Sequence, residues 1–208
     1  MLKLYYSPGS CALASHIALE EAGATYEAVR LNFKEDEQRK PDYLKVNPKG
    51  RVPALATDQG IITENPAILA YVAQSFPAAK LAPVSDPFAF ARVQAFTSYL
   101  CSTVHVAHAH NRRAYRWADD PAAIAAMQKK VPQSVGAAYA LIEDGMLAGP
   151  WVMGETYTIC DPYLFTVSNW MAGDGVDLAK LPRVMEHNRR VAERPAAKRA
   201  IAQQTGAA

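Results

Sequence analysis

The chain opens with LKLYYSPGSCALA, residues 2–14. Residues 2–6 have the composition of a short strand, a Ser-Pro-Gly-Ser turn follows, and an Ala-rich helix begins at Cys11. A thiol in the first turn of a helix lies near unpaired backbone N–H groups and the positive end of the helix dipole, and both favour the thiolate. Residues 2–14 therefore predict a strand–turn–helix unit that presents either a reactive cysteine or a small buried one.

The pattern continues outward to about residue 77. A second strand is expected at 26–31, and two further strands at 52–56 and 61–63 flank a turn at Asp58-Gln59-Gly60. A helix begins at Asn65-Pro66, with Asn65 as the N-cap and proline at the first helical position. The order βαβ and then ββα predicts a small mixed sheet with helices.

After residue 77 the sequence no longer shows the alternating strand and helix patterns of the first part. Residues 78–87 contain two prolines and little periodicity, which predicts a linker. From residue 88 apolar residues recur at spacings of three and four, the pattern of buried helix faces. We therefore predict an α/β domain over 1–77 and an all-helical domain over 88–208.

Composition narrows the functional class. The 208 residues are 50% hydrophobic and 20% charged, with a net charge of +2, which favours neither nucleic acid nor an anionic membrane as a partner. The sequence has no apolar run of about 18 residues and no leader pattern, so we expect a cytoplasmic protein. Three widely spaced cysteines do not resemble a disulfide framework, and reduced thiols fit that compartment.

Two motifs in the first domain could contact a ligand. Proline at position 53 cannot donate within a sheet, so Val52-Pro53 predicts an edge strand, a bulge or a cis bond. A cis bond would leave the backbone of Val52 free to pair with a peptide-like ligand. Glu64-Asn65 places a carboxylate beside helix N–H groups, which suits an amino-acid head group, although helix capping alone also explains Asn65.

Four segments in order resemble the glutathione S-transferase family. They are residues 5–11 (YYSPGSC), 47–55 (NPKGRVPAL), 63–68 (TENPAI) and 154–165 (GETYTICDPYLF), so the resemblance spans almost the whole chain. The cysteine after Pro-Gly-Ser is most similar to the bacterial beta class. The resemblance implies a thioredoxin-like N-terminal domain, an all-α C-terminal domain, and a homodimer with glutathione bound in the cleft between the domains.

The resemblance also assigns roles to residues. It implies catalytic roles near the glutathione sulfur for Cys11, Ser10 and His105, and glutathione-binding roles for Lys34, Val52, cis-Pro53, Glu64, Asn65 and Ser102. Ser98, Ser102 and His105 are spaced by four and three residues, so a regular helix would bring them to one face. The chain departs from the family pattern at Asn65, where serine is common, and at Val106, where some beta-class members have lysine.

The favoured function is activation of glutathione for attack on hydrophobic electrophiles, with Cys11 beside the glutathione sulfur, able to hydrogen-bond it or form a mixed disulfide. Ala14 occupies the position of a resolving cysteine, so thiol–disulfide exchange would use a single thiol. The alternatives are a non-catalytic glutathione-binding scaffold and a specialised dehalogenase or isomerase. The co-substrate pocket would include residues such as Tyr115 or Trp117. No metal is expected, because His105, His108 and His110 do not share one helix face.

Overall fold

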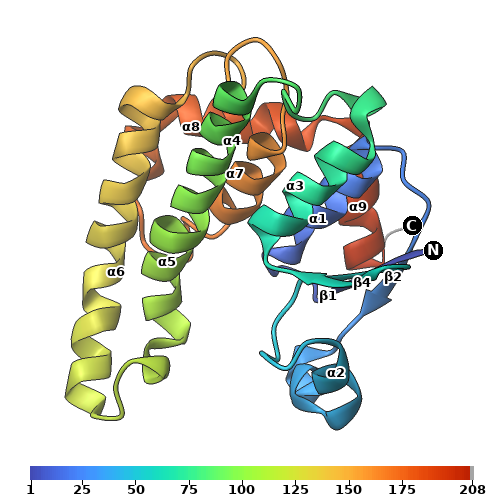
Figure 1. The fold of residues 1–208 in the computed structure, drawn as a ribbon. Helices are drawn as coiled ribbons and strands as arrows, with labels where there is room; N and C mark the ends of the chain where they lie inside the picture. Colours follow the sequence, from blue (N-terminus) through green and yellow to red (C-terminus); the bar gives the residue numbers. More distant parts are fainter. Residues whose placement is uncertain (207–208) are drawn as a thin grey trace.

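A computed structural model describes residues 1–206 (Figure 1). The N-terminal part forms a four-stranded sheet in the order β2-β1-β3-β4. The central β1 runs parallel to β2 and antiparallel to β3, and β3 pairs with β4 as a hairpin. The strands and helices of this part are β1 (Leu2–Tyr6), α1 (Ala12–Glu21), β2 (Tyr26–Arg30), α2 (Pro41–Val46), β3 (Ala54–Thr57), β4 (Gly60–Thr63) and α3 (Asn65–Ser75). The predicted mixed sheet is confirmed.

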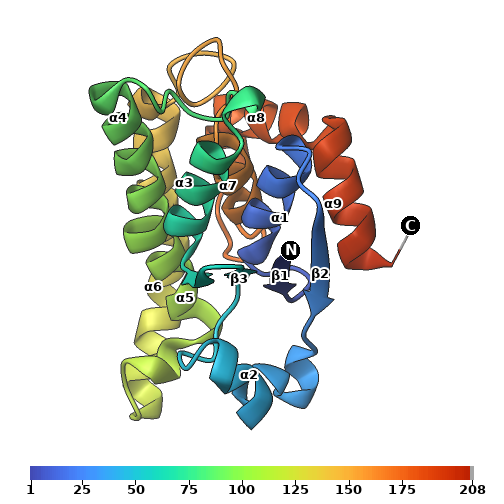
Figure 2. The ribbon, with the colours of Figure 1, turned by 45° about the vertical axis from the view of Figure 1, so that its right-hand side comes forward.

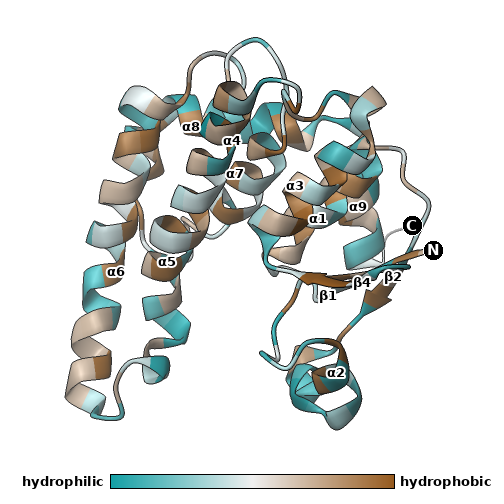
Figure 3. Cartoon of the chain, viewed as in Figure 1, coloured by the Kyte–Doolittle hydropathy of each residue, from teal (hydrophilic) through white to brown (hydrophobic). Residues whose placement is uncertain are grey.

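The two faces of the sheet are covered differently. Helices α1 and α3 lie on one face and the short α2 on the other, as Figure 2 shows. Leu4 of β1 and Leu55 of β3 are fully buried and opposite one another, and both belong to the main core. Figure 3 shows hydrophobic residues along β1 and α1 and many hydrophilic residues around α2. The face toward α2 buries only a small cluster of side chains, so α2 and its loops are less firmly anchored.

The rest of the chain is helical, apart from an isolated bridge between Trp151 and Gly154. Its helices are α4 (Pro87–Tyr99), α5 (His105–Arg112), α6 (Pro121–Leu141), α7 (Cys160–Ser168), α8 (Pro182–Ala192) and α9 (Pro195–Thr205). Asp161 begins α7 by accepting hydrogen bonds from the backbone N–H groups of Thr158 (2.6 Å) and Val152 (2.8 Å). Asp161 thus caps the start of α7 in the manner of a capping box.

A π-helical turn over residues 100–104 separates α4 from α5. The sequence pattern had predicted one continuous helix across this segment. A π turn bonds residue i to i+5 and inserts one residue relative to an α-helix, so it rotates the following side chains about the axis. The face that Ser98 and Ser102 share is therefore not the face of His105.

One hydrophobic core continues from the sheet into the helices. Helix α9 packs against α1, where Arg194 pairs with Glu21 (2.8 Å) and His16 bonds Gln203 (2.8 Å). The last helix thus rests on the first domain, and the division at 78–87 stays a prediction. Within residues 1–206 no helix combines the length and hydrophobicity needed to cross a membrane.

Candidate functional site

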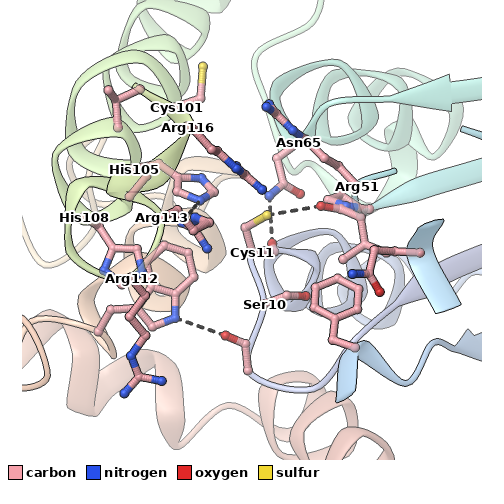
Figure 4. A pocket seen from close by; sticks show the side chains of 18 of the residues that line it. Ser10, Cys11, Arg51, Asn65, Cys101, His105, His108, Arg112, Arg113 and Arg116 are labelled. Atoms are coloured by element: carbon pink, nitrogen blue, oxygen red, sulfur yellow. Dashed lines mark hydrogen bonds between the residues drawn. The ribbon is translucent and has the colours of Figure 1, made fainter. Parts of the chain in front are cut away.

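A cleft of about 900 Å³ lies between the sheet domain and the helical domain. We call its two sides the N-terminal wall, formed by Ser10, Cys11, Arg51, Val52, Pro53, Glu64 and Asn65, and the helical wall, formed by His105, Arg112, Arg113, Arg116 and Trp170. Figure 4 shows side chains of both walls around the sulfur of Cys11. Small-molecule sites occupy about 300–1,000 Å³, so this cleft has room for a tripeptide and a second small ligand.

Cys11 lies at the start of α1, as expected, and its surroundings decide between a reactive thiolate and a buried thiol. Its Sγ donates to the backbone oxygen of Val52 at 3.4 Å, so the group is a thiol. Burial raises the pKa of Cys11 to about 12, although the positive charge of Arg113 opposes the shift. Of the two alternatives, the structure therefore favours the buried thiol over the thiolate at Cys11, because the loss of solvation outweighs the helix dipole.

The hydroxyl of Ser10 is already engaged in the turn that starts the helix. It donates to the carbonyl of Ser7 (2.6 Å) and accepts from the N–H of Ala12 (3.3 Å). Gly9 precedes it with φ +73°, a conformation that glycine adopts without strain. Ser10 lines the cleft, but its proton is directed at the backbone and not at a ligand.

The Val52–Pro53 peptide bond is cis, and both residues line the cleft. Within residues 1–206, the carbonyl of Val52 accepts only the long bond from Cys11 described above, so it can exchange that weak sulfur donor for a ligand N–H. Glu64 also lines the cleft and has φ +74°, a conformation that costs a non-glycine residue about 1–3 kcal/mol and that is concentrated at functional sites. Its carboxylate bonds the ammonium of Lys49.

The expectation that Asn65 caps α3 is wrong. The helix begins at Asn65, and Glu64 is the residue that precedes it. The Asn65 amide donates to the carbonyl of Cys11 (2.7 Å) and accepts from the hydroxyl of Ser15 (2.6 Å). This buried side chain fixes α3 against α1 and so positions the thiol, while serine in its place would be too short to make both bonds.

Two of the expected binding residues lie outside the cleft. Ser102 is exposed and its hydroxyl donates to the carbonyl of Ser98 (2.8 Å), because the π turn directs it away from His105. Lys34 is exposed on a 3₁₀ turn, and the nearby residues that reach the cleft are Phe33, Asp36, Gln38 and Arg39. Contacts of Lys34 and Ser102 with glutathione stay predictions.

His105 lines the cleft, as expected, but in a cationic setting. A guanidinium nitrogen of Arg113 lies 3.3 Å from its Nε2, so that nitrogen accepts and the ring proton is on Nδ1. Burial lowers the pKa of His105 to about 3, and the charge of Arg113 adds to the shift. His105 is therefore neutral near pH 7 and holds Arg113 in place instead of donating through Nε2 to a sulfur.

The arginines of the cleft are the functional residues that the sequence analysis missed. Arg112 is the last residue of α5, Arg113 and Arg116 follow it within four positions, and Arg51 faces them from the N-terminal wall. The sequence carried a signal, the cationic run RRAYR at 112–116, but the run could equally have formed a solvated surface. Trp170 joins the walls, because its indole N–H donates to the carbonyl of Gly9 at 3.1 Å.

Within residues 1–206, no three His, Cys, Asp or Glu side chains gather in a way that could hold a metal ion. The cleft is instead lined by thiols, backbone groups, the rings of His105 and His108, and several guanidinium groups. Such a set suits a polar, anionic organic ligand that carries its own sulfur.

Comparison with known proteins agrees with this chemistry. Residues 1–74 match the family model of the glutathione S-transferase N-terminal domain. The chain is 33% identical to glutathione S-transferase GstA of Escherichia coli O157:H7 over 202 residues, which is 93% of this chain and 94% of that protein. This chain belongs to the glutathione S-transferase family.

Solved structures of the family match the whole fold. A glutathione transferase homologue from Sulfitobacter, solved with bound glutathione, superposes with a TM-score of 0.93 at 43% identity and covers 99% of this chain and 98% of its own. The beta-class glutathione S-transferase of Sphingomonas chungbukensis gives a TM-score of 0.85 at 33% identity, covering 97% and 98%. The predicted thioredoxin-like domain with a helical partner is thereby confirmed as a glutathione S-transferase fold.

Proposed function

We propose that this transferase binds glutathione along the N-terminal wall and conjugates it to electrophilic small molecules. The observation that carries the proposal is the convergence of the Cys11 thiol, the Val52 carbonyl and Glu64 on one cleft. The backbone of Val52 would pair with the cysteinyl part of glutathione, and Glu64 would hold the ammonium of the γ-glutamyl head. Pro53 and Asn65 hold these groups in position.

The thiol of Cys11 would then act as a hydrogen-bond donor. Its S–H releases the Val52 carbonyl and turns to the glutathione sulfur, which favours the glutathione thiolate as its proton leaves to solvent. Arg113 adds a positive charge near the same point, because its charge acts on the Cys11 thiol. A pKa of about 12 leaves roughly one molecule in 10⁵ as thiolate at pH 7, so hydrogen bonding is favoured over nucleophilic attack by Cys11 itself.

The chemical step follows from the bound thiolate. Its sulfur forms a bond to the electrophilic carbon while the leaving group departs with its bonding electrons, or, in an addition, the new carbanion takes a proton from water. Proximity of the two ligands in one cleft supplies much of the rate enhancement. His105 would contribute by holding Arg113 in its orientation.

Glutathione titration calorimetry and conjugation of a chlorodinitrobenzene test this proposal in wild type, Cys11→Ala and Cys11→Ser. We expect the wild type to bind and conjugate glutathione, Cys11→Ala to lose roughly tenfold in kcat/KM, and Cys11→Ser to keep part of it because a hydroxyl also donates. Absence of glutathione binding by the wild type contradicts the proposal. Binding without any turnover would favour a non-catalytic scaffold instead.

We also propose that the protein is a homodimer of the cytoplasm. Phe88 at the start of α4 is 78% exposed and Ile61 on the edge strand β4 is 45% exposed, and exposed apolar groups of this size favour association. Its three cysteines are free, which fits a reducing compartment. Light scattering of the wild type and of Phe88→Glu tests the dimer: we expect twice the monomer mass for the first and a shift toward monomer for the second.

A further inference from the structure

Four arginines of the cleft have no acidic partner within residues 1–206: Arg51, Arg112, Arg113 and Arg116. The arginines at the other end of the chain behave differently. Those at 189, 190, 194 and 199 each form an ion pair with a glutamate. The four arginines near the C-terminus are thus paired, whereas these four arginines of the cleft are not, within residues 1–206.

The acidic groups that line the cleft do not balance this charge, because each already has partners. Glu64 pairs with Lys49, and Asp36 pairs with Arg39, another arginine of the cleft (3.9 Å). Asp174 is buried and bonds the ring of His108 at 2.7 Å and the amide of Asn111 at 3.0 Å. The guanidinium groups therefore give the cleft a positive potential in its free state.

Of the four arginines, Arg113 is the one with a buried donor that lacks a hydrogen-bond partner among residues 1–206. Its Nε is buried and has no hydrogen-bond partner, and another of its nitrogens reaches only the neutral ring of His105 (3.3 Å). Burial lowers the pKa of Arg113, and the neighbouring charge of Arg116 lowers it further. A half-buried guanidinium with an unsatisfied buried donor is costly unless an anion neutralises it, so this geometry is poised for a negatively charged ligand.

The arginines stand beside aromatic side chains. Tyr115 and Trp117 line the cleft with 51% and 48% of their surface exposed, and Trp117 stacks on His110 with ring centroids 4.2 Å apart. Aromatic faces take flat apolar groups, while guanidinium groups take carboxylates through paired N–H donors. We propose that the helical wall binds an electrophile that carries a carboxylate beside a flat apolar body, a specificity that rests on the proposed conjugating function.

Glutathione also carries carboxylates, but most of its expected binding residues lie on the opposite wall, namely Val52, Pro53, Glu64 and Asn65. In Figure 4, His105, Arg113 and Arg116 extend from the helical side toward Cys11, while Ser10 and Asn65 lie across the thiol from them. Glutathione held by Val52 and Glu64 places its sulfur between the walls and leaves the helical wall to the second substrate. A role in glutathione binding would therefore appear as a changed affinity for glutathione, which can be measured separately.

The first test compares 4-chloro-3,5-dinitrobenzoate with its methyl ester, two electrophiles that differ in the one negative charge. We expect kcat/KM, normalised to the uncatalysed reaction with glutathione, to favour the benzoate by roughly tenfold to a hundredfold, the range of one or two charge-assisted hydrogen bonds. A wild-type enzyme that favours the ester, or treats both alike, overturns the proposal.

Variants then locate the site. Arg116→Gln should lower the benzoate-to-ester ratio several-fold and leave the KM for glutathione within about twofold. Arg113→Gln should lower the same ratio and also weaken glutathione activation, because Arg113 is expected to favour the glutathione thiolate. Arg116→Lys keeps the charge and should restore part of the ratio. Arg30→Gln, an exposed arginine outside the cleft with no ion pair in residues 1–206, changes the net charge equally and should keep the wild-type ratio. If Arg116→Gln raises the KM for glutathione and leaves the benzoate-to-ester ratio unchanged, the assignment of a carboxylate site to the helical wall is overturned.

Binding without turnover separates this inference from the conjugating function. The two conjugates are made chemically and their dissociation constants are measured by calorimetry, with wild type and with Arg116→Gln. Tighter binding of the carboxylate conjugate that is lost in Arg116→Gln supports the anion site even if no conjugation is detected, an outcome that contradicts only the proposed function. Equal binding of both conjugates contradicts the anion site.

Discussion

The two walls of the cleft differ in the chemical groups that they offer to a ligand. The N-terminal wall offers mainly backbone groups and side chains held by hydrogen bonds, such as the Val52 carbonyl and the Asn65 amide, and it also carries Arg51. The helical wall offers long cationic side chains, of which Arg113 is half-buried with one buried nitrogen left without a hydrogen bond in the described part of the chain. Backbone groups do not change with side-chain substitution, so the N-terminal wall suits glutathione, the substrate common to every reaction. The side chains of the helical wall can change by substitution, so this wall suits the second substrate, which varies.

Breaking the support beneath both walls should have the largest effect. Asp161 is fully buried and accepts from the N–H groups of Val152 and Thr158 and bonds the ring of His187 (2.9 Å), and its helix α7 packs on α1. Asp161→Ala leaves these groups unpaired, so we expect a loss of about 3–5 kcal/mol in the free energy of unfolding, measured in urea.

The matched control is Asp177→Ala, an aspartate that caps an exposed turn by accepting from Ala179 (3.2 Å). It should cost only about 1 kcal/mol, the usual value of a cap. Equal losses in the two variants would contradict the role assigned to Asp161.

A change in the N-terminal wall should affect glutathione and spare the second substrate. Glu64→Gln removes the charge expected to hold the ammonium of glutathione, so we expect its dissociation constant to rise roughly tenfold to a hundredfold. The benzoate-to-ester preference should persist, because it belongs to the helical wall. Glu27→Gln, which removes a surface partner of Lys3 (2.8 Å), is the control. Unchanged glutathione affinity in Glu64→Gln would contradict the assignment of glutathione to the N-terminal wall.

The buried ring of His105 should make the helical wall sensitive to acid. The pKa of His105 is about 3 in the folded protein and about 6.5 when unfolded, so below pH 6.5 the unfolded state binds more protons. Stability should therefore fall as the pH drops from 6.5 toward 3, by up to about 1.4 kcal/mol per pH unit from this group. Urea titrations of wild type and His105→Gln between pH 4 and 7 measure it. If the free energy of unfolding changes with pH by the same amount in both proteins, the lowered pKa of His105 is contradicted.

The smallest effect is expected where the walls join. Trp170→Phe removes the indole hydrogen bond to Gly9 but keeps an aromatic ring beside His108 (centroids 4.4 Å apart), so the expected loss is about 0.5–1.5 kcal/mol. Trp117→Phe alters an exposed ring and should change the free energy of unfolding by less than about 0.5 kcal/mol. A larger loss in Trp117→Phe than in Trp170→Phe would remove the argument that Trp170 joins the domains.

Much of the N-terminal wall could be predicted from sequence because its geometry is local. The turn before Cys11 and the hairpin between β3 and β4 depend on residues within a few positions of one another, and the structure confirms both. The helical wall was harder to predict. A π turn at residues 100–104 changed the phase of the helix, so the predicted common face of Ser102 and His105 was wrong.

The sequence by itself determined the order of elements, the family and the presence of a thiol at the start of α1, because these depend on local patterns and on motifs that follow one another along the chain. The tertiary structure decided the protonation state of that thiol, because burial raises the pKa of Cys11 and outweighs the helix dipole. It also decided that Arg51 meets Arg113 and Arg116 across one cleft. Solvation and the meeting of distant charges depend on packing between domains, which a local pattern does not record.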